Sequence, residues 1–148
     1  MKCLFSLIIA VGFAGVAQAA DIQIGDLAIH QPSARQSPKG ADVGAAFMVI
    51  ENGGKNADRL IAATAENADH VEIHEMSMTD GVMKMRELPG GLDIAAGGKV
   101  ELKPGSYHLM LMGLKQPIAA SAVIKGSLTF ERAGKVAVEF VTPAAGSK

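Results

Sequence analysis

Cysteine is nearly absent from this chain of 148 residues, because Cys3 is its only one. Lys2 and Cys3 stand in front of an apolar run over residues 4–16, and the small-residue tripeptide Ala-Gln-Ala follows at 17–19. This order is typical of a secretory signal peptide, so we predict that residues 1–19 are removed on export to the periplasm. Cys3 precedes the apolar run and therefore cannot be a lipid-anchor cysteine. The mature chain then contains no cysteine, which excludes disulfide bonds.

A strong charge of one sign is also lacking. The formal net charge is -1, and loss of Lys2 makes it -2, which favours neither nucleic acid nor an anionic membrane surface as a partner. The N-terminal apolar run is shorter than the roughly 20 residues of a membrane helix, so no membrane insertion is expected after cleavage. Residues 20–148 show no internal repeat and are enough to bury one core without covalent staples.

The residues after position 20 favour a β protein. Short apolar or alternating runs recur between turn residues and no long stretch has helical periodicity, a spacing typical of antiparallel sandwiches and barrels. We predict one all-β domain over 20–141, a hairpin turn at 79–81, a loop over 31–44 and a flexible tail over 142–148. The expected strands lie within 21–30, 45–51, 60–65, 70–78, 82–88, 100–102, 107–112, 122–130 and 135–141.

Methionine is unusually concentrated. Seven methionines follow the predicted signal peptide, and six of them lie within residues 76–112, far more than an even spread would place there. His74 and His108 lie beside this cluster. The six are Met76, Met78, Met83, Met85, Met110 and Met112.

Strand geometry places these donors together. Side chains alternate between the two faces of a strand, so each expected strand carries its sulfur and imidazole groups on one face and its aliphatic residues on the other. The first strand has His74, Met76 and Met78 on one face, the returning strand has Met83 and Met85, and the later strand has His108, Met110 and Met112. If these strands are neighbours, thioethers and imidazoles meet.

Thioether sulfur is a soft, neutral donor that selects Cu(I), and imidazole also suits copper. A site of two histidines and two methionines carries no ligand charge and matches a soft monovalent ion. Zinc is disfavoured, because structural zinc sites use Cys, His and carboxylate ligands. The alternative is that methionine only fills the core of a metal-free β-sandwich that binds another protein.

Other functions fit the residues poorly. A blue-copper electron-transfer site needs a cysteine thiolate, and the mature chain has none. An enzyme is not expected, because there is no nucleophile elbow, and the zinc-protease pattern fails where Met78 replaces the second histidine after His74-Glu75.

The segments HEMSMTDGVMKMRELPGG and AAGGKVELKPGSYHLMLMGLKQP closely resemble the PCu(A)C family of periplasmic copper chaperones, and VGAAFMVIENGG resembles the same family upstream. The likeness covers about residues 22–141. The family pattern is a His, ten residues, a Met, a gap of about 21 residues and His-x-Met. Here ten residues separate His74 from Met85, and 22 residues separate Met85 from His108. Glu75 replaces the Met of some members, and the Trp that many members carry is missing.

The resemblance implies a cupredoxin-like sandwich or barrel that binds Cu(I) through His74, Met85, His108 and Met110. It also implies delivery of copper to the binuclear copper site of cytochrome c oxidase, with oxidase subunit II, a Sco-type protein or both as partners. A periplasmic copper-buffering or resistance protein without a dedicated client would use the same site and is the alternative. A monomer is the simplest expectation.

The remaining candidates are expected to be structural. Packing around the site is favoured for four methionines over a role as extra donors, and Met48 is expected in the core. His70 is interpreted as a surface residue, and His30, which lies far off in the sequence, is not expected to bind the metal. A solvated strand face is favoured for Glu72 and Glu75, although a carboxylate beside His74 could orient its imidazole. The four methionines are Met76, Met78, Met83 and Met112.

Overall fold

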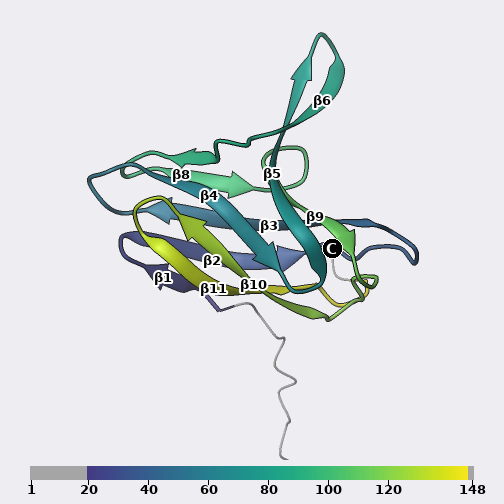
Figure 1. Ribbon diagram of the computed structural model, residues 1–148. Helices are drawn as coiled ribbons and strands as arrows, with labels where there is room; N and C mark the ends of the chain where they lie inside the picture. Colours follow the sequence, from purple (N-terminus) through teal and green to yellow (C-terminus); the bar gives the residue numbers. More distant parts are fainter. Residues whose placement is uncertain (1–19, 147–148) are drawn as a thin grey trace, which may run out of the picture.

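The computed structural model describes residues 20–146, and these residues form strands and turns without any helix (Figure 1). The predicted signal peptide lies outside the described residues. Within them no helix is long and apolar enough to cross a membrane. The strands are β1 Ile22–Ile24, β2 Leu27–Ala34, β3 Val43–Asn52, β4 Asp58–Ala65, β5 Ala68–Thr79, β6 Val82–Glu87, β7 Leu92–Ile94, β8 Lys99–Leu102, β9 His108–Leu114, β10 Val123–Phe130 and β11 Gly134–Val141.

The strands form one curled sheet in the order β6-β5-β9-β3-β2-β11-β10-β4-β7. All pairings are antiparallel except β11 with β2. β1 adds to β2, and β8 pairs with the half of β3 that β9 leaves free. β4 also packs against β5, its neighbour in sequence, so the two arms of the sheet face one another. The all-β, cupredoxin-like fold predicted from the sequence is therefore confirmed.

The core lies between the two arms of the sheet. Alternation along β3 and β2 turns every second side chain inward, and both arms supply fully buried residues. Ile29, Ile50 and Leu111 come from one arm, and Leu128 and Phe140 from the other. Met48 belongs to this core, as predicted, with 2% of its surface exposed.

One predicted loop is partly wrong. Residues 31–44 were expected to be a loop, but β2 continues to Ala34. Its pairing with β3 is interrupted between His30 and Ser33, where Gln31 has a φ of 50°. This irregularity lets the strand resume with Pro32 and Ala34 buried. The Pro and Ser in this stretch are typical of a loop, but the sheet tolerates them at a bulge.

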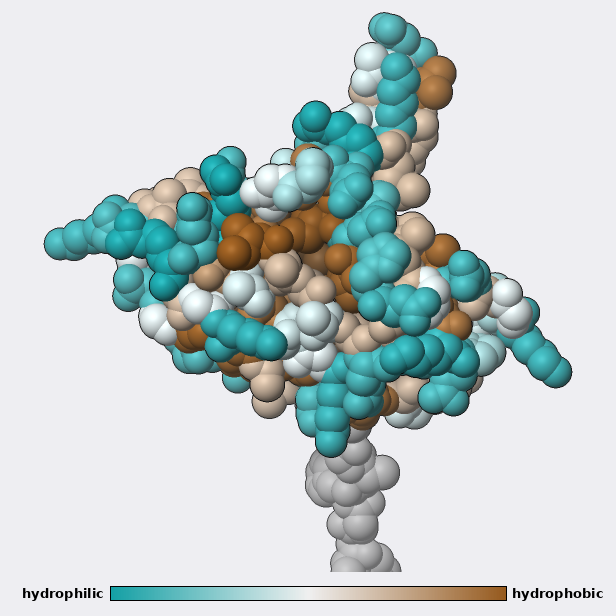
Figure 2. Space-filling model, viewed as in Figure 1, coloured by the Kyte–Doolittle hydropathy of each residue, from teal (hydrophilic) through white to brown (hydrophobic). Residues whose placement is uncertain are grey.

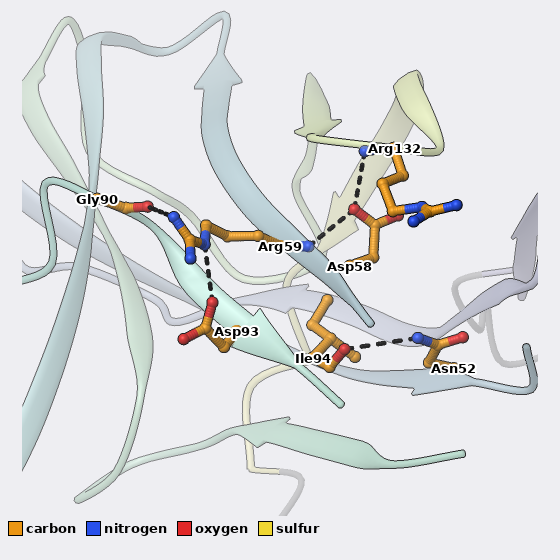
Figure 3. A network of polar contacts seen from close by, with 7 residues as sticks. All are labelled: Asn52, Asp58, Arg59, Gly90, Asp93, Ile94 and Arg132. Carbon is orange, nitrogen blue, oxygen red and sulfur yellow. Dashed lines mark hydrogen bonds and ion pairs between the residues drawn. The ribbon is translucent and has the colours of Figure 1, made fainter. Parts of the chain in front are cut away.

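Polar side chains join the ends of strands to neighbouring strands and turns through hydrogen bonds (Figure 3). Buried Asp58 accepts hydrogen bonds from the backbone N–H groups of Arg59, Arg132 and Ala133, at 2.8, 2.9 and 3.0 Å. These bonds join the start of β4 to the β10–β11 turn. Arg59 in turn binds the Asp93 carboxylate at 2.7 Å, which ties β4 to β7.

Asn52 closes the turn that follows β3. Its amide nitrogen donates to the carbonyl oxygens of Asn56 and Ile94, at 2.9 and 3.5 Å, and its side-chain oxygen accepts from Gly54 N–H. Thr142, at the start of the expected tail, is buried and its N–H bonds Ala122 O at 2.8 Å. The expected domain boundaries remain a prediction.

The β5–β6 hairpin projects from the body of the molecule (Figure 1). Asp80 and Gly81 form its turn, with φ values of 53° and 74°. Positive φ at both central residues is the geometry of a two-residue hairpin turn and suits Asp-Gly. The predicted turn is therefore confirmed. Every residue of β6 is exposed, so the outer half of the hairpin packs on no other strand.

Candidate metal site

The predicted ligands come from three adjacent strands, β6, β5 and β9. His74 pairs with His108 across β5 and β9, and Glu72 pairs with Met110. Across β5 and β6, Met76 pairs with Met85 and Met78 with Met83. Since Ile73 and Leu109 point into the core, strand alternation places these paired residues on the opposite face. The fold therefore brings the predicted donors to one face of three neighbouring strands.

The two histidines form the inner part of this face. Their ring centroids lie 5.7 Å apart, with a 39° angle between the ring planes. His108 is 5% exposed, and the side chain of His74 is 11% exposed. Two imidazoles that are nearly buried and directly opposite each other can both contact one ion.

Hydrogen bonds define which nitrogen of each ring can be a donor to a metal. His108 Nδ1 lies 3.1 Å from the carbonyl oxygen of Ser106, so Nδ1–H donates and the lone pair is on Nε2. His74 Nε2 lies 2.8 Å from Glu72 Oε2, so Nε2–H donates and the lone pair is on Nδ1. His74 Nδ1 is buried and has no hydrogen-bond partner among residues 20–146. Burial of an unpaired nitrogen is unfavourable, and a metal ion would satisfy it.

Glu72 bridges two histidines. Its Oε2 binds His74, and its Oε1 lies 3.0 Å from His70 Nε2. The hydrogen bond with His74, and after it that with His70, holds the pKa of the Glu72 carboxyl below its ordinary value. The ionised carboxylate can therefore accept the His74 Nε2–H and fix the ring orientation, as partners of metal-binding histidines commonly do.

The two predicted methionine ligands differ in environment. Met110 is half-buried between Glu72 of β5 and Ala45 of β3. Met85 is 49% exposed on β6, opposite Met76. Met85 thus lies on the free hairpin, and Met110 lies on the body of the molecule. The four-ligand set remains a prediction, although all four residues share this face.

Hard donors do not gather in the same way. Among residues 20–146, no three side chains from His, Cys, Asp and Glu are placed to hold a metal ion. The methionines on this face can add sulfur donors to the two imidazoles. That donor set fits soft Cu(I) and does not fit zinc.

The other candidate residues differ in burial and in their contacts. Met76 and Met112 are half-buried, in line with the expected packing role, whereas Met78 and Met83 are exposed and pack little. His70 is exposed, as expected for a surface residue, although it contacts Glu72. His30 binds Asp21 and Glu51, away from the predicted ligands.

The contact of Glu72 with His74 was not the interpretation that the sequence favoured. A solvated strand face was favoured for it, yet it contacts His74 directly. The available signal was the i, i+2 spacing of His70, Glu72 and His74, which puts all three on one face. Glu75 has the opposite parity and instead forms an ion pair with Arg86 at 2.7 Å.

The fold is a cupredoxin-like β domain that resembles solved PCuAC domains. The copper-bound PCuAC domain from PmoF2 has a TM-score of 0.73 and 20% identity, covering 84% of this chain and 98% of that one. The solution structure of CuI-DR1885 from Deinococcus radiodurans has a TM-score of 0.62 and 22% identity, covering 86% and 83%. At this identity the likeness establishes the fold.

The sequence comparisons give the family. A family model described as "Putative lipoprotein LpqE-like" matches residues 27–142 of this chain. The Putative lipoprotein Lxx21020 of Leifsonia xyli subsp. xyli (strain CTCB07) is 32% identical over 119 residues, covering 70% of this chain and 72% of the relative. This chain therefore belongs to the LpqE-like family.

Proposed function

We propose that this protein is an exported carrier of Cu(I), without catalytic turnover, that binds one ion through His74, Met85, His108 and Met110. The observation that carries the proposal is the buried, unpaired Nδ1 of His74, held beside His108 in a ring pair with methionines on the same face. The copper named in the descriptions of two similar structures adds support.

The placement of Met85 suits a carrier. A carrier must release its ion to another protein, so at least one ligand has to be reachable from outside. Met85 is half-exposed on β6, an edge strand that among residues 20–146 pairs only with β5, whereas His74 and His108 are nearly buried. Neutral thioethers are weak donors, so transfer starts with release of Met85 and entry of a ligand from the acceptor.

The client and the compartment are part of the proposal. The resemblance to periplasmic copper chaperones favours the binuclear copper site of cytochrome c oxidase, with subunit II or a Sco-type protein as acceptor. The secretory signal pattern at 1–19 and the lipoprotein description of the family favour export. A periplasmic copper buffer without a client is the alternative, and retention of oxidase activity in a deletion strain would favour it.

The test is a Cu(I) titration of residues 20–148 under anaerobic, reducing conditions, followed by X-ray absorption on the loaded protein. One tight equivalent with both sulfur and nitrogen ligands is expected, and His108→Ala should remove it. His30→Ala is the matched control, because His30 contacts only Asp21 and Glu51 in the ion pairs described. Binding that is indifferent to His108 would refute the proposed site.

A further inference from the structure

The tip of the β5–β6 hairpin exposes methionine in a way that packing does not explain. Met78 is 66% exposed and Met83 is 54% exposed. A methionine stabilises a protein by removing its apolar surface from water, and these two keep most of that surface in solvent. Figure 2 shows the hairpin extending free of the body, so no neighbouring strand covers its tip.

The strand register pairs these thioethers. Met78 lies directly opposite Met83, and Met76 lies directly opposite Met85. Directly opposite residues in an antiparallel pair have Cβ atoms about 4.5–5.5 Å apart, and methionine has three rotatable bonds beyond its Cα. The two sulfur atoms of each pair can therefore converge on one ion. The pairs form a row of four thioethers along one face of the hairpin.

The outer pair is too far from the histidines to share their ion. Met78 lies four residues beyond His74 on β5, and a strand rises about 3.3 Å per residue, which gives about 13 Å. Met76 and Met85 lie between the two positions. An ion held at the tip would therefore occupy a separate site, with the inner methionine pair as the next donors along the row.

We propose that Met78 and Met83, with Met76 next in the row, form a second site for Cu(I) at the hairpin tip. The site takes a soft monovalent ion because thioether sulfur is its only donor type. With no imidazole it binds more weakly than the histidine pair and fills second. This inference rests on the proposed function for its cargo, but the two sites are tested separately.

The experiment uses residues 20–148 labelled with 13C at the methionine methyl groups, titrated anaerobically with Cu(I) and followed by NMR. The first equivalent should move the Met85 and Met110 signals. The second should move the Met78 and Met83 signals. The double variant Met78→Leu/Met83→Leu should keep the first response and lose the second equivalent. Its substitutions are exposed, so the fold is not at risk.

Val82→Leu is the matched control, because Val82 is exposed at the same hairpin tip but lies opposite Thr79, on the other face, and has no sulfur. It should keep both responses. Met78 and Met83 signals that stay fixed up to several equivalents would overturn the inference, as would a second equivalent that the double variant retains. A missing first response with a normal second one would instead refute the histidine site and leave the tip site standing.

Discussion

The hydrogen bond between Glu72 and His74 gives the sharpest test of the proposed copper site at His74 and His108. The carboxylate lies 2.8 Å from His74 Nε2 and leaves Nδ1 as the nitrogen with the free lone pair. Glu72→Gln keeps an oxygen that can accept the same N–H but removes its charge. Charge-assisted hydrogen bonds are roughly twice as strong as neutral ones, so the ring is held less firmly and its Nδ1 becomes a weaker donor.

The expected magnitude follows from the role of such partners. Loss of a group that orients a metal-binding histidine typically costs 10- to 100-fold in metal affinity, or about 1.4–2.7 kcal/mol. Glu72→Gln should lie near the lower end, with about a 10-fold loss. Glu72→Ala should approach 100-fold, because no acceptor then holds His74 Nε2–H.

The assay is competition for Cu(I) against a chromophoric chelator under anaerobic conditions. Glu101→Gln is the matched control, because Glu101 also has a lowered pKa, owing to Lys103 and then Lys99, but lies on β8. It should change the affinity less than about two-fold. If both Glu72 variants stay within two-fold of the original protein, the carboxylate does not position His74 and the reasoning fails.

Two further predictions concern the fold. Gly126→Ala should destabilise the protein by about 1–3 kcal/mol in thermal unfolding, because a Cβ there would collide with the Thr64 carbonyl oxygen. His30→Gln should lower stability to urea more at pH 5 than at pH 8, by less than about 1 kcal/mol. The hydrogen bond with Asp21 raises the His30 pKa, so its stabilisation is complete below the unfolded value of about 6.5 and is lost as pH rises through the folded pKa.

The control for the glycine variant is Gly90→Ala, where a Cβ would meet no atom within 4 Å. It should stay within about 0.5 kcal/mol. Equal losses of stability in Gly126→Ala and Gly90→Ala would contradict the close approach of β4 to β10. An equal loss at both pH values for His30→Gln would mean that protonation of His30 does not strengthen its contacts with Asp21 and Glu51.

Much of the hairpin was predictable from local sequence. A two-residue turn at Asp80-Gly81 pairs Thr79 with Val82, so it also pairs Met78 with Met83. Likewise, alternation alone places His108 and Met110 on one face of their strand. These features depend on neighbours in the chain, and the period of a strand and the φ preference of Asp-Gly determine them.

The loop expected over 31–44 shows where local signals fail. Pro32 and Ser33 are typical of a turn, yet β2 includes both. A shift in the pairing with β3 near Gln31 accommodates them. Such a shift depends on the partner strand, so composition could not predict it.

The sequence by itself therefore determined which residues could be soft donors and which face of each strand would carry them. Only the tertiary structure decided that β9 lies beside β5, so that His74 faces His108 across 34 positions of the chain. It also decided that Glu72 holds His74, and that Met78 and Met83 stay exposed. The physical reason is that strand pairing and burial depend on how distant segments close around one core, which no local pattern contains.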